Sequence, residues 1–141
     1  MSEGIFKLDK SPVSERWVIF EDDGISGWLY LTNPNEKKPI ADCWIYNRIE
    51  APASSEIKNF KNGPPPASNE YAGPYALVAE PDELKIRFKW SNDGNSVALI
   101  LDGNALGYIV TGSKVGFSKN LTKIGPWGNL FDQSSFDKLF E

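Results

Sequence analysis

The sequence predicts a mainly β protein, an antiparallel sheet or meander in the form of a sandwich or half-barrel, with a long Pro-rich loop and at most one or two short helices. Three observations predict this class. Apolar and charged residues alternate with a period of two along residues 84–90, which is typical of a half-buried strand. Turns rich in Gly, Asn and Asp separate short runs of β-branched and aromatic residues. Six of the ten prolines fall within residues 50–82.

The first fifty residues are predicted to contain a short lead-in strand followed by three longer ones. The lead-in strand lies within residues 1–15 and ends at a turn beside Pro12. The three strands that follow occupy residues 16–20, 27–32 and 40–49.

The last of these strands carries the only cysteine. Simple alternation places Trp44 and Tyr46 on one face of the strand. The other face is then formed by Cys43, Ile45 and Asn47. These apolar surroundings predict a buried thiol that packs as a small hydrophobic group. Because the chain has no histidine to act as its base, a catalytic thiol is not expected.

Residues 84–118 are predicted to form an antiparallel meander of four strands joined by three short turns. Its first strand alternates four apolar residues with three basic ones. The apolar residues are Leu84, Ile86, Phe88 and Trp90. The basic row is Lys85, Arg87 and Lys89. We interpret the row as a solvated face or as an edge protected by lysine. Contact with phosphate or with an acidic protein is the alternative.

Two segments lie outside these strands. Residues 50–82 are predicted to form a long loop or insertion within one domain that spans residues 1–141. So long a loop is uncommon in a small domain and is either functional or mobile. The tail, residues 134–141, is predicted to form one or two helical turns, capped by Ser134 or Ser135.

Composition disfavours several kinds of site. With no histidine and one cysteine, neither a Ser-His-Asp site nor a Cys/His zinc site can be assembled, and no Gly-rich phosphate loop is present. We therefore expect no catalytic residue, no cofactor and no metal. The formal net charge of −4 disfavours nucleic acid as a partner. We expect no membrane contact and a cytoplasmic location, because no signal peptide or membrane-spanning run is visible and the thiol is single.

The run Glu21-Asp22-Asp23-Gly24 is the strongest acidic candidate. Adjacent carboxylates at a strand end point in opposite directions, which disfavours the facing pair that a glycosidase needs. The run also lacks the spaced ligands of a calcium loop. A solvated turn and an acidic contact patch for a basic partner remain as the two interpretations.

Two tryptophans are the aromatic candidates. Trp127 lies in a loop between Pro126 and Gly128, where it is either a lid over the core or an exposed interface anchor. Trp28 lies in a predicted strand. If exposed, both rings could stack on sugars, and a carbohydrate-binding module is therefore an alternative function. The missing export signal disfavours that alternative.

Three stretches occur together in a recognisable order. The first stretch, residues 20–30, has the pattern Phe-Glu-Asp-Asp-Gly-x-x-Gly-x-x-Tyr. The second is Ile-Tyr-Asn at residues 45–47. The third, residues 83–100, begins with Glu-Leu-Lys-Ile, contains Trp-Ser-Asn-Asp-Gly and ends with Ala-Leu-Ile. In this order they resemble an uncharacterised bacterial family of short acidic proteins, described only as a domain of unknown function. The resemblance covers residues 16–49 and 81–110, and the Pro-rich segment departs from it. Short acidic proteins of this kind are similar to immunity proteins encoded beside bacterial toxins.

We therefore expect a non-enzymatic protein-binding domain, and most specifically a cytosolic immunity protein that neutralises a bacterial toxin by binding and occluding it. The expected partner is a basic toxin domain, and both a monomer and a homodimer remain open. A carbohydrate-binding module is the first alternative, and a carboxylate-based enzyme is the second. The candidate contact residues are Glu21, Asp22, Asp23, Trp28 and Trp127.

Overall fold

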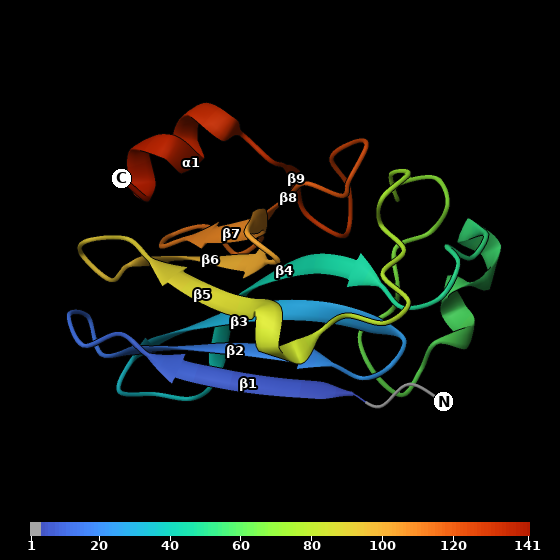
Figure 1. Ribbon diagram of the computed structural model, residues 1–141. Coiled ribbons are helices and arrows are strands. Elements are labelled where there is room, and N and C mark those ends of the chain that lie inside the picture. The colour runs from blue at the N-terminus through green and yellow to red at the C-terminus, as the bar shows by residue number, and fades with distance from the viewer. Residues whose placement is uncertain (1–3) are drawn as a thin grey trace.

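Two β-sheets and a terminal helix form three layers in the computed structural model, which describes residues 4–141 (Figure 1). The first sheet is antiparallel and consists of β1 (Ile5–Lys10), β2 (Arg16–Asp22), β3 (Ser26–Pro34) and β4 (Pro39–Asn47). The second consists of β5 (Ile86–Trp90), β6 (Ser96–Leu101), β7 (Asn104–Val110), β8 (Phe117–Ser118) and β9 (Asn129–Leu130). Residues 1–3 of the predicted lead-in segment lie outside the described residues. The predicted mainly β class is confirmed, and the two sheets are consistent with the predicted sandwich; the strands pair in antiparallel fashion except for β8 and β9, which are parallel.

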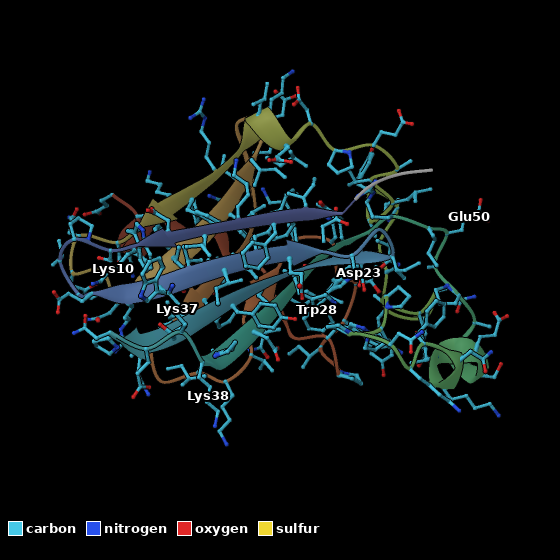
Figure 2. All side chains as sticks on the ribbon, turned by 90° about the horizontal axis from the view of Figure 1, so that it is seen from below. Lys10, Asp23, Trp28, Lys37, Lys38 and Glu50 are labelled. Atoms are coloured by element: carbon cyan, nitrogen blue, oxygen red, sulfur yellow. The ribbon has the colours of Figure 1, made fainter. Side chains whose placement is uncertain are left out.

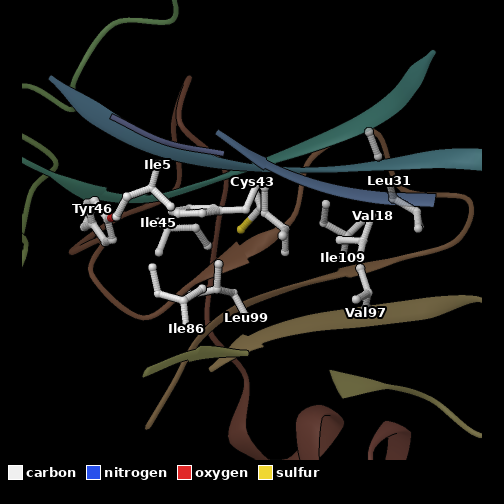
Figure 3. Packing of buried hydrophobic residues seen from close by; sticks show 13 residues of the cluster. Ile5, Val18, Leu31, Cys43, Ile45, Tyr46, Ile86, Val97, Leu99 and Ile109 are labelled. Atoms are coloured by element: carbon white, nitrogen blue, oxygen red, sulfur yellow. The ribbon is translucent and has the colours of Figure 1, made fainter. Parts of the chain in front are cut away.

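The core lies between the two sheets, where both contribute one apolar face (Figure 3). Its buried members are Ile5, Val18, Phe20, Leu29, Leu31, Ala41, Cys43, Ile45, Tyr46, Ile86, Val97, Leu99 and Ile109. The Cys43 thiol is fully buried, as its sequence context predicts, and burial raises its pKa well above the ordinary range. The thiol is therefore protonated and unreactive at neutral pH.

The sheets meet along one side, where β4 passes β8. The amide of Asp42 donates to the carbonyl of Lys114 at 3.0 Å, and the amide of Gly116 donates to the carbonyl of Asp42 at 2.7 Å. A Cβ atom on Gly116 would lie only 2.5 Å from the Cβ atom of Cys43. The join therefore requires a glycine at this position.

The other side of the sandwich is closed by side chains rather than by a ladder of backbone hydrogen bonds. Lys7 of β1 donates from Nζ to the carbonyls of Glu83 and Ile86, at 3.1 and 3.2 Å. Trp90 of β5 donates from Nε1 to a carboxylate oxygen of Asp9 at 3.2 Å. These contacts hold β1 next to β5 and leave the backbone edges of both strands unpaired with each other.

The predicted alternation along β4 is wrong at its end. The register shifts between the pairs Gly27–Tyr46 and Trp28–Trp44, which is a β-bulge. Because of the bulge, Tyr46 joins Cys43 and Ile45 in the core instead of sharing the face of Trp44. Asn47 moves to the outer face, where its carboxamide accepts the indole N–H of Trp44 at 3.0 Å.

The Pro-rich segment, residues 50–82, folds against one end of the first sheet, and we call it the strap (Figure 1). It contains the 3-10 helix η1 (Ser54–Asn59) and packs on the outer face of β3 and β4. Asn47 anchors it, since its side chain donates to the carbonyl of Ala67 and accepts from the amide of the same residue, both at 2.9 Å. The cluster beneath the strap consists of Trp28, Trp44, Ala67, Ala76, Leu121 and Trp127.

Helix α1 (Gln133–Leu139) covers the outer face of the second sheet. The predicted apolar face of this helix is confirmed, since Phe136, Leu139 and Phe140 pack around Tyr108 of β7. The predicted cap is wrong: Asp132, rather than Ser134 or Ser135, accepts the amide of Ser135 at 3.1 Å. Within residues 4–141 no helix is both long and apolar enough to cross a membrane.

The predicted meander is confirmed over β5 to β8, with one change at its start. Leu84 lies in the 3-10 helix η2 (Glu83–Lys85) and is 83% exposed, so it is not part of the buried face. Arg87 and Lys89 are exposed, as the solvated-face interpretation predicts. Lys85 forms a loose ion pair with Asp102 at 3.7 Å.

We predict that Trp44→Ala lowers the free energy of unfolding by about 3–5 kcal/mol, the usual cost of a buried Trp-to-Ala cavity. Trp17→Ala is the matched control, because its ring is only partly buried and is contacted by lysines, which predicts a loss of about 1 kcal/mol. Urea denaturation followed by far-ultraviolet circular dichroism measures both. Equal losses would contradict the assignment of Trp44 to a packed cluster beneath the strap.

Candidate functional site

The outer face of the first sheet carries aromatic, aliphatic and charged side chains in register. Across β1 and β2 the ladder pairs Phe6 with Glu21, Leu8 with Ile19, and Lys10 with Trp17. It continues through β3 and β4 from Ile19 to Tyr30 and Asp42. We use the name open face for the surface formed by Phe6, Leu8, Trp17, Ile19, Tyr30 and Ile40.

This face is exposed because the strap covers only part of the sheet. Viewed from below, no segment of residues 4–141 passes in front of β1 and β2 (Figure 2). Phe6 is 59% exposed, Leu8 42% and Ile40 39%. Trp17 and Ile19 are partly buried by their neighbours on the sheet. A contiguous apolar surface of this kind, surrounded by charged residues, is typical of an interaction site.

One end of the open face carries Lys10, Lys37 and Lys38, which we call the basic end, and the adjoining turns also carry Glu15 and Glu36 (Figure 2). The Nζ atom of Lys37 lies 4.6 Å from the centre of the Trp17 ring, and that of Lys10 lies 5.9 Å from it. Both are within cation–π range. Two ammonium groups are therefore held over a single ring at the start of β2.

The opposite end is acidic, and we call Glu21 and Asp23 the acidic end. Both side chains are exposed, and Asp23 accepts the amides of Ile25 and Ser26 at 2.9 and 3.1 Å. Burial raises the pKa of Tyr30 to about 12, helped by the charges of Glu21, Asp42 and Asp23. The negative field of these carboxylates therefore extends over the middle of the face.

Asp22, the third predicted acidic candidate, lies on the other side of β2 and is buried. Its Oδ2 atom accepts the Tyr46 hydroxyl at 2.6 Å and the Arg48 Nη1 group at 2.7 Å. Its Oδ1 atom accepts the amide of Gly24 at 2.8 Å. The Asp22 side chain is 0% exposed and that of Arg48 is 4% exposed, so this is a buried, hydrogen-bonded ion pair. A partner cannot reach this carboxylate from the surface.

Both predicted tryptophans are also buried. Trp28 and Trp127 are each 7% exposed, within the cluster beneath the strap. The Trp127 indole donates to the carbonyl of Pro65 at 3.1 Å, and that of Trp28 donates to Ser26 Oγ at 3.1 Å. Trp127 is thus a lid over packed residues, one of its two predicted roles. With neither ring face free, stacking of these two residues on sugars has no support.

The sequence reasoning missed the central residues of the open face, Trp17, Ile19 and Tyr30. The sequence of β2 does indicate an apolar outer face. Its core residues Val18 and Phe20 alternate with Trp17, Ile19 and Glu21 on the outer side. An apolar residue on both sides of a strand indicates that both faces are used. Phe6 and Leu8 carry the same signal in β1, but the register that aligns them with β2 is visible only in the structure.

A second surface feature lies at the β6–β7 turn. Two neighbouring hollows of about 580 and 410 Å³ share Asn104 and Lys119 in their linings. Tyr75 and Asp102 line the larger one, and Phe136 lines the smaller. In the described part of the chain, no three His, Cys, Asp or Glu side chains lie close enough together to hold a metal ion.

Comparison of the sequence with family models and with curated proteins, and of the fold with solved structures, finds no match.

We predict that Asp22→Asn lowers the free energy of unfolding by about 3–5 kcal/mol, because it removes the carboxylate charge from a buried, hydrogen-bonded ion pair. The control is Lys123→Met, which breaks the exposed Lys123–Glu70 pair (2.8 Å) and should leave stability unchanged. Urea denaturation measures both. Similar effects of the two variants would contradict a special role for the buried pair.

Proposed function

We propose that this chain is a non-enzymatic protein-binding domain that contacts its partner through the open face. In its most specific form, it is an immunity protein that binds a bacterial toxin and occludes the toxin's active surface. The observation that carries the proposal is the uncovered apolar face between an acidic and a basic end. The family resemblance of the sequence and its acidic pI of about 4.9 support the more specific form.

The residue types of the open face fit protein recognition. Trp and Tyr are enriched among the residues that dominate binding energy, and the face has Tyr30 beside its middle row and Trp17 at its basic end. Both are held on a hydrogen-bonded sheet, so their ordering costs little entropy on binding. Phe6 and Leu8 extend the apolar area to the edge of the sheet, where they are more exposed.

The acidic end gives the face a preference for a basic partner. Glu21 and Asp23 are exposed, and the carboxylate of Asp42 lies close enough to act on Tyr30. Negative charge beside an apolar contact steers a positively charged surface toward it and disfavours acidic competitors. An inhibitor built in this way acts by covering the partner and needs no chemistry of its own.

The test is co-expression with the product of the neighbouring gene in cells that this product kills. We predict that the wild-type chain protects, while Leu8→Glu and Glu21→Lys lose protection and bind an inactivated form of the partner at least about tenfold more weakly. Glu141→Lys is the matched control, since it makes the same charge change beside α1, on the opposite layer. Calorimetry or biolayer interferometry measures the affinities.

Two results would contradict the proposal. One is a neighbouring gene product that is harmless to the cells. The other is full protection by both open-face variants when their urea midpoints match that of the wild-type chain.

A further inference from the structure

We propose that the open face also pairs with a second copy of this chain, in an antiparallel dimer that sets the basic end of each copy against the acidic end of the other. The inference rests on the proposed function only in taking the open face as the contact surface. Its basis is the distribution of charge: Lys10 and Lys37 lie at one end of β1–β2, and Glu21 and Asp23 lie at the other.

A two-fold axis makes this face complementary to itself. Two copies placed face to face are related by an axis that lies in the plane between them. If the axis runs across the strands, it reverses the strand direction, so that the basic end of one copy covers the acidic end of the other. An axis along the strands would instead place lysines over lysines. The charges therefore favour the antiparallel arrangement over the parallel one.

The register of β1 and β2 identifies the opposing residues. Leu8 and Ile19 form the middle row and lie near the axis, where each meets its own counterpart. Glu21 is two residues along β2 from Ile19, and Trp17 is two residues away on the other side. In the antiparallel dimer Glu21 therefore faces Trp17 of the second copy, between the ammonium groups of Lys10 and Lys37.

The strap limits how far the contact can extend. Two aligned sheets pack with their strands crossed by about 30°. If the contact is centred on β1 and β2, the gap between the two copies therefore widens toward β4. The strap covers part of β3 and β4 and also reaches the acidic end, where Asp23 lines a hollow with residues 59–64 (Figure 2), so it bounds the contact on both of these sides. Asp42 of β4 is also at this margin, away from the centre of the contact.

The size of the contact predicts weak association. Three strands spaced about 4.8 Å apart and about 20 Å long give a footprint of roughly 300 Å² on each copy, which is below the usual size of a specific interface. We therefore expect a weak dimer that forms only at high protein concentration and that a heterologous partner with a larger contact could displace. The dimer would then protect the apolar face until a basic partner replaces the second copy.

Sedimentation equilibrium from about 5 to 500 µM, a range suited to a small interface, tests the inference on the full chain. We expect a reversible dimer for the wild-type chain and a monomer for Leu8→Glu. Glu21→Lys and Lys37→Glu should each weaken the dimer about tenfold. The double variant Glu21→Lys/Lys37→Glu should recover most of that loss, because in the antiparallel pair the two exchanged charges meet across the interface. Its net charge equals that of the wild-type chain.

Three results would overturn the inference: a monomer at every concentration, a dimer unaffected by the single exchanges, or a double variant weaker than either single one. Far-ultraviolet dichroism and urea midpoints that match those of the wild-type chain show that a variant is folded. We expect this for both charge exchanges, because both exchanged residues are exposed. The proposed function is tested separately. A monomeric wild-type chain whose protection is lost in Leu8→Glu overturns the dimer alone. A dimer that is lost in Leu8→Glu, while both Leu8→Glu and Glu21→Lys still protect fully, supports the dimer and overturns the proposed function.

Discussion

The buried ion pair between Asp22 and Arg48 orders the end of the first sheet and, through it, the surface outside. Asp22 lies at the last position of β2, Arg48 follows β4, and the Nε group of Arg48 reaches the strap through the carbonyl of Ala79 at 3.0 Å. Because successive side chains of a strand point to opposite faces, burying Asp22 requires that Glu21 points outward. One internal carboxylate thus helps to place the neighbouring carboxylate on the open face.

The first sheet has apolar residues on both of its faces, and those on the outer face need an explanation. Its inner face packs against the second sheet, and the strap covers part of its outer face with a tryptophan cluster. Phe6, Leu8 and Ile40 remain exposed. Solubility alone favours polar residues at such positions, so their apolar character supports the proposal that a partner binds there.

Much of the fold follows from local signals. Period-two alternation and Gly-containing turns predict the strands and the meander, because each depends on neighbouring residues only. The face of β4 on which Tyr46 lies could not be predicted, since it depends on a bulge in the pairing of β3 with β4. The ordered conformation of the strap depends on Asn47, which is twenty residues away in the sequence from its hydrogen-bond partner Ala67. The open face was missed for the same reason, because it exists only after β1, β2 and β3 are aligned.

The central claim, that partners bind on the open face, is tested most directly by an amide chemical-shift map of the isotope-labelled chain with an inactivated product of the neighbouring gene. We predict that the largest shifts fall on Phe6–Lys10 and on Trp17–Glu21, and that the shifts of α1 stay unchanged. Shifts confined to α1, or to the hollows around Asn104 and Lys119, would contradict it.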